Sequence, residues 1–565
     1  MNNDQNMNNA SQQTKHPSLW EGLGRLRTIR ILLASVMFIG ITWLFLDFTG
    51  TAHHWLSWMA KMQLLEAILA GSALIVALLT VLTLLFGRIY CSVICPLGIM
   101  QDIFGWFGKK AKKNRYGYSK EKKWVRYPLL VVFIIAHAVG FAVLVQLLAP
   151  YAAFGRIATN LLQPIYQAGN NVLAAIAEHY DSYAFYQSEV WLRSGISLGI
   201  AAVTLVALAF LAWRNGRTYC NTICPVGTLL SLISRFSLLK VRFDVDKCKS
   251  CSLCSKNCKA ACIDFKTHSV DASRCVVCGD CIESCKFGAL RYSMKPLLTE
   301  REPRPEGMEG QKADPLEKER EQNQKEPLEK EREENQKEPL LTEREQRPES
   351  MEGAIPEKGR RSFLLSSALL ATAAMAQQKD KMMDGGLAEI EDKVAPERQT
   401  PLTPPGSLSA QNMAHNCTGC QLCISECPNQ VLRPSSDLMH LMQPVMSYER
   451  GYCRPECNRC SEVCPAGAIK PIKAEDKASL QIGHAVWIKK NCIPLTDGVE
   501  CGNCERHCPV GAIEMVPSNP DDEESPYVPA VNEARCIGCG ACENLCPARP
   551  FSAIYVEGHE VHKEV

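Results

Sequence analysis

The first half of the chain consists of long apolar stretches separated by polar loops. A helix needs about 20 apolar residues to cross a bilayer, and four stretches come close to that length. They are roughly residues 31–48, 64–86, 128–149 and 190–213. The first is not a cleavable secretory signal, because three more stretches follow it and no small-residue cleavage site ends it. The pattern predicts an α-helical membrane domain with four transmembrane helices.

Basic residues are concentrated in one loop of this domain. Between the second and third stretches the chain carries ten Lys and Arg residues, whereas the other two loops carry mainly Lys61 and Arg156. Because loops rich in Lys and Arg stay in the cytoplasm, the N-terminus and the segment after Trp213 are expected to be cytoplasmic.

Each pair of apolar stretches is followed by the same phrase. Residues 87–98 read GRIYCSVICPLG and residues 216–227 read GRTYCNTICPVG. The shared pattern indicates a duplicated two-helix unit with its phrases at the cytoplasmic surface. Its cysteines either meet as one thiolate-rich metal or Fe–S site or form two buried or redox-active thiol pairs. They are Cys91, Cys95, Cys220 and Cys224. As the thiolates nearest the bilayer, they are expected to carry electrons away when the membrane domain oxidises a quinol.

Polar residues inside the apolar stretches are few, and in a bilayer such residues are functional candidates. Glu66 lies near the outer end of the second stretch and His137 near the middle of the third. Each is a candidate proton acceptor for a quinol, and the alternative is a helix–helix hydrogen bond. A membrane haem needs two histidines at matching depth, but His53, His54 and His179 lie outside the stretches. No b-type haem is therefore expected.

Cysteines carry the strongest chemical signal, with 29 in the chain. Two runs with the spacing C-x2-C-x2-C-x3-C follow the last apolar stretch: Cys248, Cys251, Cys254 and Cys258, then Cys275, Cys278, Cys281 and Cys285. In two-cluster bacterial ferredoxins with this spacing, each run lends its fourth thiolate to the other cluster. A zinc site needs only four ligands, so two matched runs favour two [4Fe-4S] clusters. Cys262 is left over, either as an alternative ligand or as a bystander.

Four further runs occupy the C-terminal third of the chain, and a proline follows the last cysteine of each. They are Cys417, Cys420, Cys423 and Cys427; Cys453, Cys457, Cys460 and Cys464; Cys492, Cys501, Cys504 and Cys508; and Cys536, Cys539, Cys542 and Cys546. Together the six runs contain 24 cysteines. They predict six [4Fe-4S] clusters with these cysteines as the iron ligands.

A charged repeat separates the two groups of runs. Residues 296–353 contain neither cysteine nor aromatic residues, and PLEKEREQNQKE is followed at once by PLEKEREENQKE. Such a segment cannot bury a core and is expected to be a solvated spacer. After it, Arg360 and Arg361 precede a short apolar stretch that ends at Ala376. This order is typical of a twin-arginine (Tat) export signal placed inside the chain; the alternative is an amphipathic helix after an ordinary Arg-Arg pair.

Composition excludes several other classes. With 62 Lys and Arg against 60 Asp and Glu, the net charge is only +2, so no nucleic-acid partner is expected. The chain has no G-x-G-x-x-G, P-loop or C-x-x-C-H motif, which argues against dinucleotide, nucleotide and covalent haem sites. No flavin-binding domain is recognisable either.

These signals divide the chain into five parts. They are a membrane domain (1–240), a two-cluster ferredoxin module (241–295), a charged linker (296–356), an internal export signal (357–376) and a four-cluster ferredoxin domain (377–565). Both ferredoxin modules are expected to have an α+β ferredoxin-like fold.

The motifs resemble two families of one respiratory system. The first 295 residues resemble NapH, the membrane quinol-dehydrogenase component of periplasmic nitrate reduction, through the four apolar stretches, the two Y-C-x-x-x-C-P phrases and the two-cluster module. Residues from about 357 onward resemble NapG, the Tat-exported four-cluster ferredoxin of that system. The chain therefore resembles a fusion of the two; whether it is cleaved after Ala376 is open.

The resemblance implies a function and a location. Electrons would pass from menaquinol or ubiquinol through Fe–S clusters to a periplasmic reductase, by way of a cytochrome. The protein would lie in the bacterial inner membrane, with the first ferredoxin module cytoplasmic and the second periplasmic after passage through the Tat translocon. In related four-cluster proteins the first and fourth runs share one pair of clusters, and the second and third share the other.

Two other hypotheses about the function remain. One is a maturation module, similar to the ferredoxin-like proteins that accompany methylamine dehydrogenase, in which the clusters supply electrons for cofactor assembly. The other is a thiol or metal sensor built on the membrane cysteines, since NosR-like regulators share the C-x3-C-P phrases.

Overall fold

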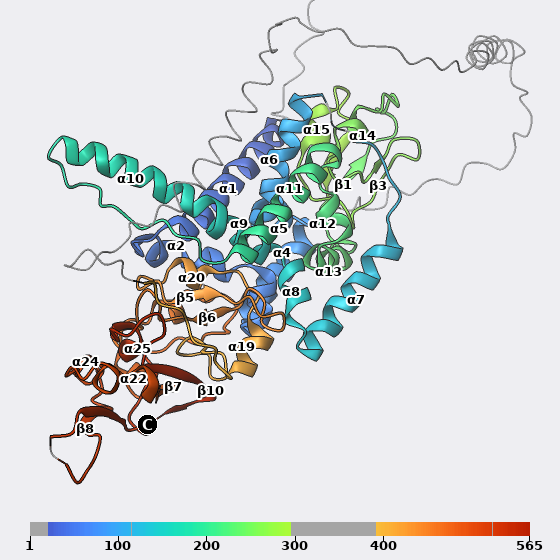
Figure 1. The fold of residues 1–565 in the computed structure, drawn as a ribbon. Helices are drawn as coiled ribbons and strands as arrows, with labels where there is room; N and C mark the ends of the chain where they lie inside the picture. Colours follow the sequence, from blue (N-terminus) through green and yellow to red (C-terminus); the bar gives the residue numbers. More distant parts are fainter. Residues whose placement is uncertain (1–20, 113, 115, 295–390, 523, 565) are drawn as a thin grey trace, which may run out of the picture. The chain divides into compact units, whose positions relative to one another are not determined.

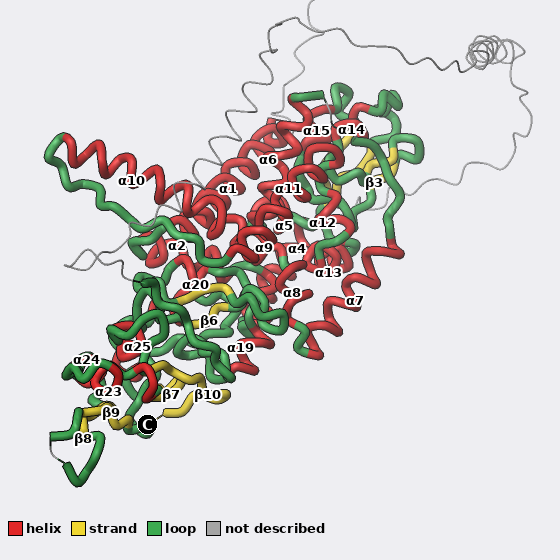
Figure 2. Tube along the Cα trace, in the orientation of Figure 1, coloured by secondary structure: helices red, strands yellow, loops and turns green. Residues whose placement is uncertain are grey.

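The computed structural model describes residues 21–112, 114, 116–294, 391–522 and 524–564. The predicted charged linker and the predicted export signal both lie outside the described residues. The described segments before and after them belong to one folded unit. The N-terminal part is helical and the C-terminal part combines short helices with two-stranded sheets (Figures 1 and 2).

In the described residues from 21 onward, the N-terminal part contains fourteen helical elements before the first strand. They are α1 (Glu21–Leu46), α2 (Thr51–Lys61), α3 (Leu64–Leu69), α4 (Ala73–Phe86), α5 (Tyr90–Val93), α6 (Pro96–Lys110), α7 (Lys123–Val139), α8 (Ala142–Leu148), α9 (Pro150–Ile157), η1 (Ala158–Leu162), α10 (Gln163–His179), α11 (Gly195–Asn215), α12 (Thr218–Thr222) and α13 (Pro225–Ser234).

Two of the four predicted spans form continuous helices in the described part of the chain. Residues 27–46 of α1 and the whole of α11 are long and apolar enough to cross a membrane. Apolar side chains of α11 point outward: Val203 and Val206 are 69% and 68% exposed. Exposed apolar surface of this extent is typical of a membrane-facing belt, so the two helices are consistent with membrane association.

The prediction of four transmembrane helices is wrong for the other two stretches. The second stretch breaks at Gly71, whose φ of +68° ends α3 and leaves α4 with only 14 residues. The third stretch breaks at Gly140 (φ +82°), between α7 and α8. Glycine adopts such left-handed conformations readily, and hydropathy does not register them. A bent pair, α8 with the helix from Pro150 to His179, raises the candidate spans among the described residues to three at most.

The first ferredoxin module, called here the N-terminal module (240–294), is built on two short antiparallel sheets. Strand β1 (Lys240–Phe243) pairs with β4 (Leu290–Ser293), and β2 (Ile263–Asp264) pairs with β3 (Ser269–Val270). Helices α14 (Leu253–Asn257) and α15 (Asp280–Ser284) each follow the first cysteines of a run. The β2–β3 hairpin thus joins the two runs.

The second ferredoxin module, called here the C-terminal module (391–564), repeats this plan. Its elements are α19 (Ala410–Asn416), α20 (Leu422–Ser425), β5 (Leu432–Pro434), β6 (Pro444–Met446), α21 (Arg459–Val463), α22 (Ala474–Lys477), β7 (Leu480–Trp487), η2 (Lys489–Asn491), α23 (Ile493–Thr496), α24 (Asn503–Arg506), β8 (Ile513–Pro517), β9 (Tyr527–Val531), α25 (Ala541–Leu545) and β10 (Ile554–Glu564). Strands β5 and β6, β8 and β9, and β7 and β10 pair antiparallel.

The helices contact one module at each of their ends. At the start of α11, Gln421 donates a hydrogen bond to the Ser197 hydroxyl (2.7 Å), and just after its end the Arg217 N–H donates to the Lys259 carbonyl (2.8 Å). Arg27 of α1 contacts Asp280 of the N-terminal module, and Thr49 just after α1 contacts Arg459 of the C-terminal module. Phe86 at the end of α4 contacts Tyr292 of the N-terminal module, and Ala70 just before α4 contacts Gly467 of the C-terminal module. The N-terminal and C-terminal modules therefore lie at opposite ends of these helices.

Candidate functional site

The two runs of the N-terminal module exchange their fourth cysteines. One cavity is lined by three cysteines of the first run and one of the second: Cys248, Cys251, Cys254 and Cys285. In the other direction, the thiols of Cys278 and Cys281 lie within electrostatic reach of Cys258. This is the exchange that the ferredoxin spacing predicts.

The four runs of the C-terminal module exchange cysteines between sequence neighbours. The second-run cavity contains Cys427 of the first run, and the third-run cavity contains Cys546 of the fourth. Conversely, Cys464 interacts with the first run and Cys508 with the fourth. The first and second runs therefore form one pair, and the third and fourth runs form the other.

The pairing implied by the NapG resemblance, first run with fourth and second with third, is wrong for this structure. The physical reason is the short hairpins between neighbouring runs. Strands β5 and β6 fold the chain back between the first and second runs, and β8 and β9 do so between the third and fourth. The β2–β3 hairpin has the same place in the N-terminal module.

The cysteine sets fit [4Fe-4S] clusters better than single metal ions. Among the described residues no three His, Cys, Asp or Glu side chains are close enough to share one ion. The thiolates of a cubane bind different irons and are spaced more widely. Backbone N–H groups also donate to fourth-cysteine sulfurs: Ala289 to Cys285 (3.3 Å), Ala512 to Cys508 (3.2 Å) and Ala553 to Cys546 (3.3 Å). Such bonds stabilise thiolates and tune cluster potentials.

Cys262 lies among the ligands of the second run. Its sulfur is 3.6 Å from that of Cys258, it also reaches Cys275, and its side chain is 1% exposed. The structure therefore places the extra thiol beside a cluster site and leaves both earlier interpretations, alternative ligand and bystander, in place.

The two repeated phrases meet in a pseudo-twofold arrangement. Arg88 of the first phrase donates to the Cys220 carbonyl (3.1 Å), and Arg217 of the second donates to the Cys91 carbonyl (2.5 Å). Both arginines are fully buried. Pro96 starts α6 in the first phrase, as the equivalent proline starts α13 in the second. The repeat is thus one structure made of two halves that contact each other.

This arrangement brings the four phrase cysteines together, as the shared-site hypothesis expects. Cys95 lies within electrostatic reach of Cys220 and Cys91, and Cys224 within reach of Cys220 and Cys95. Each is only 4% exposed. We call this set the four-cysteine centre. Because no three of these thiols are close enough to share one ion, they fit an Fe–S centre better than a single soft metal.

The close contact between the two phrases leaves no room for a side chain at the last glycine of each phrase. A Cβ atom on Gly98 would lie 2.3 Å from the Cys91 carbonyl oxygen and 2.6 Å from an Arg217 nitrogen. A Cβ on Gly227 would lie 2.3 Å from the Cys220 carbonyl oxygen and 2.8 Å from an Arg88 nitrogen. No larger residue fits either position without displacing backbone.

We expect Gly98→Ala to destabilise the protein by about 1–3 kcal/mol, the usual cost of overpacking. The added methyl group would push the Cys91 carbonyl away from Arg217. The measurement is the melting temperature in detergent. Gly199→Ala is the matched control, because nothing lies within 4 Å of a Cβ there. Equal melting temperatures for both variants would contradict the close packing of the phrases.

Buried charges fasten the N-terminal module to the four-cysteine centre. Asp102 of α6 accepts from Arg217 (2.7 Å) and pairs with Lys259 (3.0 Å), next to a cluster cysteine. Burial alone would raise the pKa of Asp102, but Arg217 and Lys259 outweigh it and hold that pKa well below its usual range. The carboxylate is therefore charged at neutral pH, and it links the second phrase to the module.

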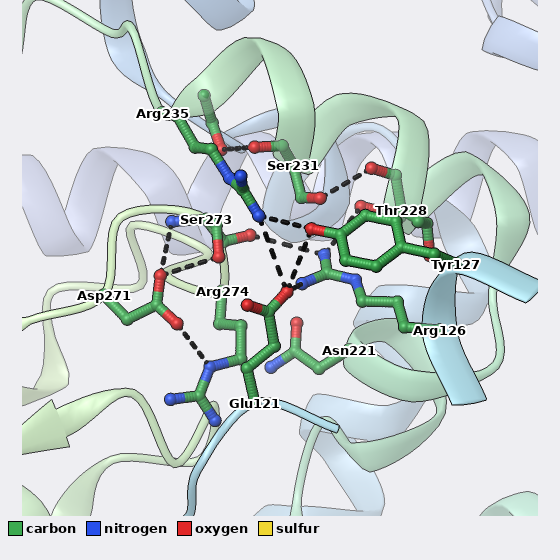
Figure 3. A network of polar contacts seen from close by, with 12 residues as sticks. Glu121, Arg126, Tyr127, Asn221, Thr228, Ser231, Arg235, Asp271, Ser273 and Arg274 are labelled. Atoms are coloured by element: carbon green, nitrogen blue, oxygen red, sulfur yellow. Dashed lines mark hydrogen bonds and ion pairs between the residues drawn. The ribbon is translucent and has the colours of Figure 1, made fainter. Parts of the chain in front are cut away.

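A second network joins α7, α13 and the same module (Figure 3). Arg126 at the start of α7 pairs with Glu121 (2.9 Å) and lies within 3.5 Å of the Ser273 carbonyl. Arg88 also donates to the Ser273 carbonyl (3.1 Å) and to Asn221 (2.8 Å). The loop before Cys275 is thus held directly against the first phrase and α7, and Arg88 also joins the first phrase to the second.

Glu66 lies between the four-cysteine centre and the C-terminal module. It is 1% exposed, and its Oε1 has no hydrogen-bond partner among the described residues. Tyr151 lies within electrostatic reach of both Glu66 and Cys420 of the C-terminal module, and Tyr90 within reach of both Glu66 and Cys95. An isolated buried carboxylate is costly unless water or a ligand satisfies it.

Further unpaired polar atoms surround the loop of the first C-terminal run. In the described part of the chain, side-chain atoms of Gln146, Tyr151, Arg156, Thr159 and Thr418 are buried without hydrogen-bond partners. Gln146 packs against Gly419 of this loop, and Arg156 lies within electrostatic reach of Cys420. So many unmet donors and acceptors indicate a site for water or a polar ligand.

His137 is not part of this region. It is half-buried near the end of α7 and interacts with His415 of the C-terminal module. No interaction between His137 and Glu66 is found among the described residues. The two predicted proton acceptors therefore lie in different surroundings: Glu66 is within electrostatic reach of Cys420, and His137 of His415, two residues before Cys417.

Sequence reasoning missed the residues that join the two halves. Arg88 and Arg217 occupy the second position of the repeated phrase, and that repetition was the available signal. Tyr151 and Arg156 carried no signal, because their roles depend on contact with a distant cysteine run.

Comparison with known proteins agrees with this geometry. Residues 69–115 and 194–244, which contain the two phrases, match a family described as a 4Fe-4S binding domain. Residues 268–291 match another 4Fe-4S binding domain, and residues 499–549 match a 4Fe-4S dicluster domain. The dicluster match contains parts of the third and fourth runs, which the structure pairs.

Three relatives each cover about a third of the chain. The ferredoxin-type protein MauM for methylamine utilization, from Methylobacillus flagellatus, is 30% identical over 28% of this chain and 70% of its own length. The chain belongs to the ferredoxin-type 4Fe-4S proteins. This ferredoxin-type protein is also 30% identical to MauN of Paracoccus denitrificans, over 34% of the chain and 55% of the relative. It is 28% identical to the ferredoxin-type protein NapG of Escherichia coli, over 34% of the chain and 83% of the relative.

The ferredoxin-type protein therefore spans little more than half the length of MauN. No solved structure matches it. The comparisons support electron transfer through 4Fe-4S sites, and the fusion of NapH-like and NapG-like parts stays a prediction.

Proposed function

We propose that this ferredoxin-type protein is a membrane-bound quinol dehydrogenase with six [4Fe-4S] clusters, which passes electrons to a periplasmic reductase or cytochrome of a nitrate reductase system. The observation that carries the proposal is Glu66. It is a buried carboxylate whose Oε1 has no hydrogen-bond partner among the described residues, in a region that also holds Tyr151 and Cys420.

Quinol oxidation needs that combination of groups. Converting a quinol to a quinone releases two protons and two electrons, so a proton acceptor must stand beside a one-electron acceptor. Glu66 would take the two protons one after the other and release each to water, and the unpaired donors of Arg156 and Gln146 would bind the quinol oxygens. The first C-terminal run, with Cys464 as its fourth ligand, would supply one-electron chemistry when its cluster is bound.

The position of the modules supports the proposed sidedness. They contact opposite ends of α1, α4 and α11, and the basic loop between α6 and α7 belongs to the N-terminal module's end, where Lys109 contacts Asn257. With that loop in the cytoplasm, the C-terminal module would lie on the periplasmic side, as the Tat-type signal at Arg360 requires.

Glu66→Gln tests the proposal. In anaerobic protein, reduction of the clusters by a quinol analogue should slow roughly a hundredfold, because the proton acceptor is lost. Reduction by dithionite should stay complete. Glu178→Gln on the exposed side of α10 is the control and should keep the parent rate.

Two outcomes would contradict the proposal. If Glu66→Gln is reduced by quinol as fast as the parent, the carboxylate is structural. If the parent itself ignores quinol, the dehydrogenase role is wrong. The latter result would favour the second candidate, an electron-donating maturation ferredoxin for a periplasmic enzyme such as an amine dehydrogenase, which the similarity to MauN and MauM supports.

A further inference from the structure

One cluster site of the N-terminal module opens to solution. Cys251, which lines the first cavity, is exposed, whereas Cys278 and Cys281 of the neighbouring run are 8% and 6% exposed. Apolar side chains border the open site, with Leu253 39% and Phe287 43% exposed. An exposed ligand within an apolar rim shortens the distance over which an electron must pass to a docked protein.

Positive charge surrounds this opening. Residues 247–259, which contain the first run, carry four lysines and no carboxylate. Lys249, Lys256 and Lys286 are exposed and form no ion pair with any described residue, and Lys249 lies 5.0 Å from the Phe287 ring. Lys247 is neutralised by Asp244 (3.1 Å), and Asp246 and Glu283 are the exposed acids nearby. We call Lys249, Lys256 and Lys286 the lysine rim.

The buried side of the same module leads to the four-cysteine centre. Cys275 of the second run lies within electrostatic reach of Arg88, and Asn221 of the second phrase donates to the Ala260 carbonyl (3.0 Å). Beyond the centre, Tyr90 and Glu66 lead toward the C-terminal module. Redox-capable sites therefore follow one another from the exposed Cys251 to the first C-terminal run.

We propose that the lysine rim docks a soluble one-electron carrier with an acidic surface, and that this carrier feeds electrons through the four-cysteine centre to the C-terminal module. With its cluster bound, the site at Cys251 would accept one electron from the reduced carrier, which would leave oxidised, and the second run and the paired phrases would hold the groups that pass the electron on. No proton is transferred, and no covalent bond forms or breaks. This entry is separate from quinol oxidation, so the C-terminal module has two electron sources.

The experiment uses the full-length protein and a reduced plant-type [2Fe-2S] ferredoxin as the acidic probe. The second-order rate of cluster reduction should fall as ionic strength rises, because long-range charge attraction is screened. In the variant Lys249→Glu, Lys256→Glu, Lys286→Glu the rate at low salt should fall about tenfold or more. The control Lys470→Glu, Lys473→Glu, Lys490→Glu carries the same charge change on the C-terminal module and should keep the parent rate.

A second measurement tests the route beyond the docking site. In Cys91→Ser, ferredoxin should still reduce the N-terminal module. The C-terminal clusters should stay oxidised, as followed by electron paramagnetic resonance (EPR). Dithionite should reduce both modules in every variant, which shows that the clusters are present. Quinol should reduce the lysine-rim variant at the parent rate, so failure of the quinol proposal and of this one are told apart.

Three results would overturn the proposal. The first is a parent that ferredoxin does not reduce. The second is a rate unaffected by salt or by charge reversal of the lysine rim, in which case a change only in binding to anionic vesicles would assign the lysines to lipid. The third is full reduction of the C-terminal module by ferredoxin in Cys91→Ser.

Discussion

Cys546→Ala is expected to remove the cluster of the third cysteine run. Its thiol lines the third-run cavity with Cys492, Cys501 and Cys504, so the iron content should fall by about four atoms per chain. Cys504→Ala should remove the same cluster, and the double variant should lose no more iron than either single one. Cys546→Ala combined with Cys420→Ala should lose about eight, because the structure assigns them to different clusters.

A loss of about eight iron atoms in the Cys504/Cys546 double variant, and of about four in the Cys420/Cys546 double variant, would instead support the pairing of the first run with the fourth. The baseline is the parent protein, purified without oxygen, in which iron and acid-labile sulfide should each approach roughly 24 atoms per chain. A value near eight, or stoichiometric zinc, would rule out the six-cluster proposal. An excess above that baseline would point to a further cluster at the four-cysteine centre.

Changing Arg360 and Arg361 to lysine is expected to hold the C-terminal module on the cytoplasmic side. Tat export depends on the twin arginine, and clusters loaded in the cytoplasm must be exported already folded. A reporter fused after Val565 should read periplasmic in the parent and cytoplasmic in the variant, while one fused after Leu290 reads cytoplasmic in both. The effect should be all or none.

Arg344→Lys with Arg347→Lys supplies the control, since it makes the same change in the charged linker and should leave the reporter periplasmic. If the reporter after Val565 is cytoplasmic in the parent, the internal signal is wrong. Both modules would then serve the same side, which their contacts with opposite ends of α11 make hard to accommodate.

Local spacing predicted much of the cysteine chemistry but not its connectivity. A run such as Cys248 to Cys258 brings its own thiols together through a short loop and helix, so spacing alone locates the site. Which run lends the fourth cysteine depends on how the intervening chain folds back. The hairpins β5–β6 and β8–β9 decide that, and they are too short for hydrophobic periodicity to reveal.

Hydropathy likewise located the apolar segments without their breaks. Residues 31–48 and 190–213 correspond to α1 and α11, because nothing inside them interrupts a helix. Gly71 and Gly140 divide the other two, and a glycine inside an apolar stretch does not by itself announce a left-handed turn.

The candidate site was predicted only where one residue was conspicuous by itself. Glu66 stood out as an acid in an apolar stretch, and it lies in the buried polar region. His137 stood out for the same reason but lies beside His415, half-buried. Tyr151 and Arg156 acquire their significance from Cys420, some 270 residues away in sequence.

The crossed arginines make the two halves of the helical domain behave as subunits. Arg88 serves a carbonyl of the second half and Arg217 one of the first, just as residues exchange across the twofold axis of a symmetric dimer. Each half therefore supplies a buried hydrogen bond to the phrase of the other. The loop between α6 and α7 joins the two halves covalently, and its Ser119 carbonyl also accepts a hydrogen bond from Arg274 of the N-terminal module (2.6 Å). A chain severed there would form a heterodimer whose partners depend on each other for folding.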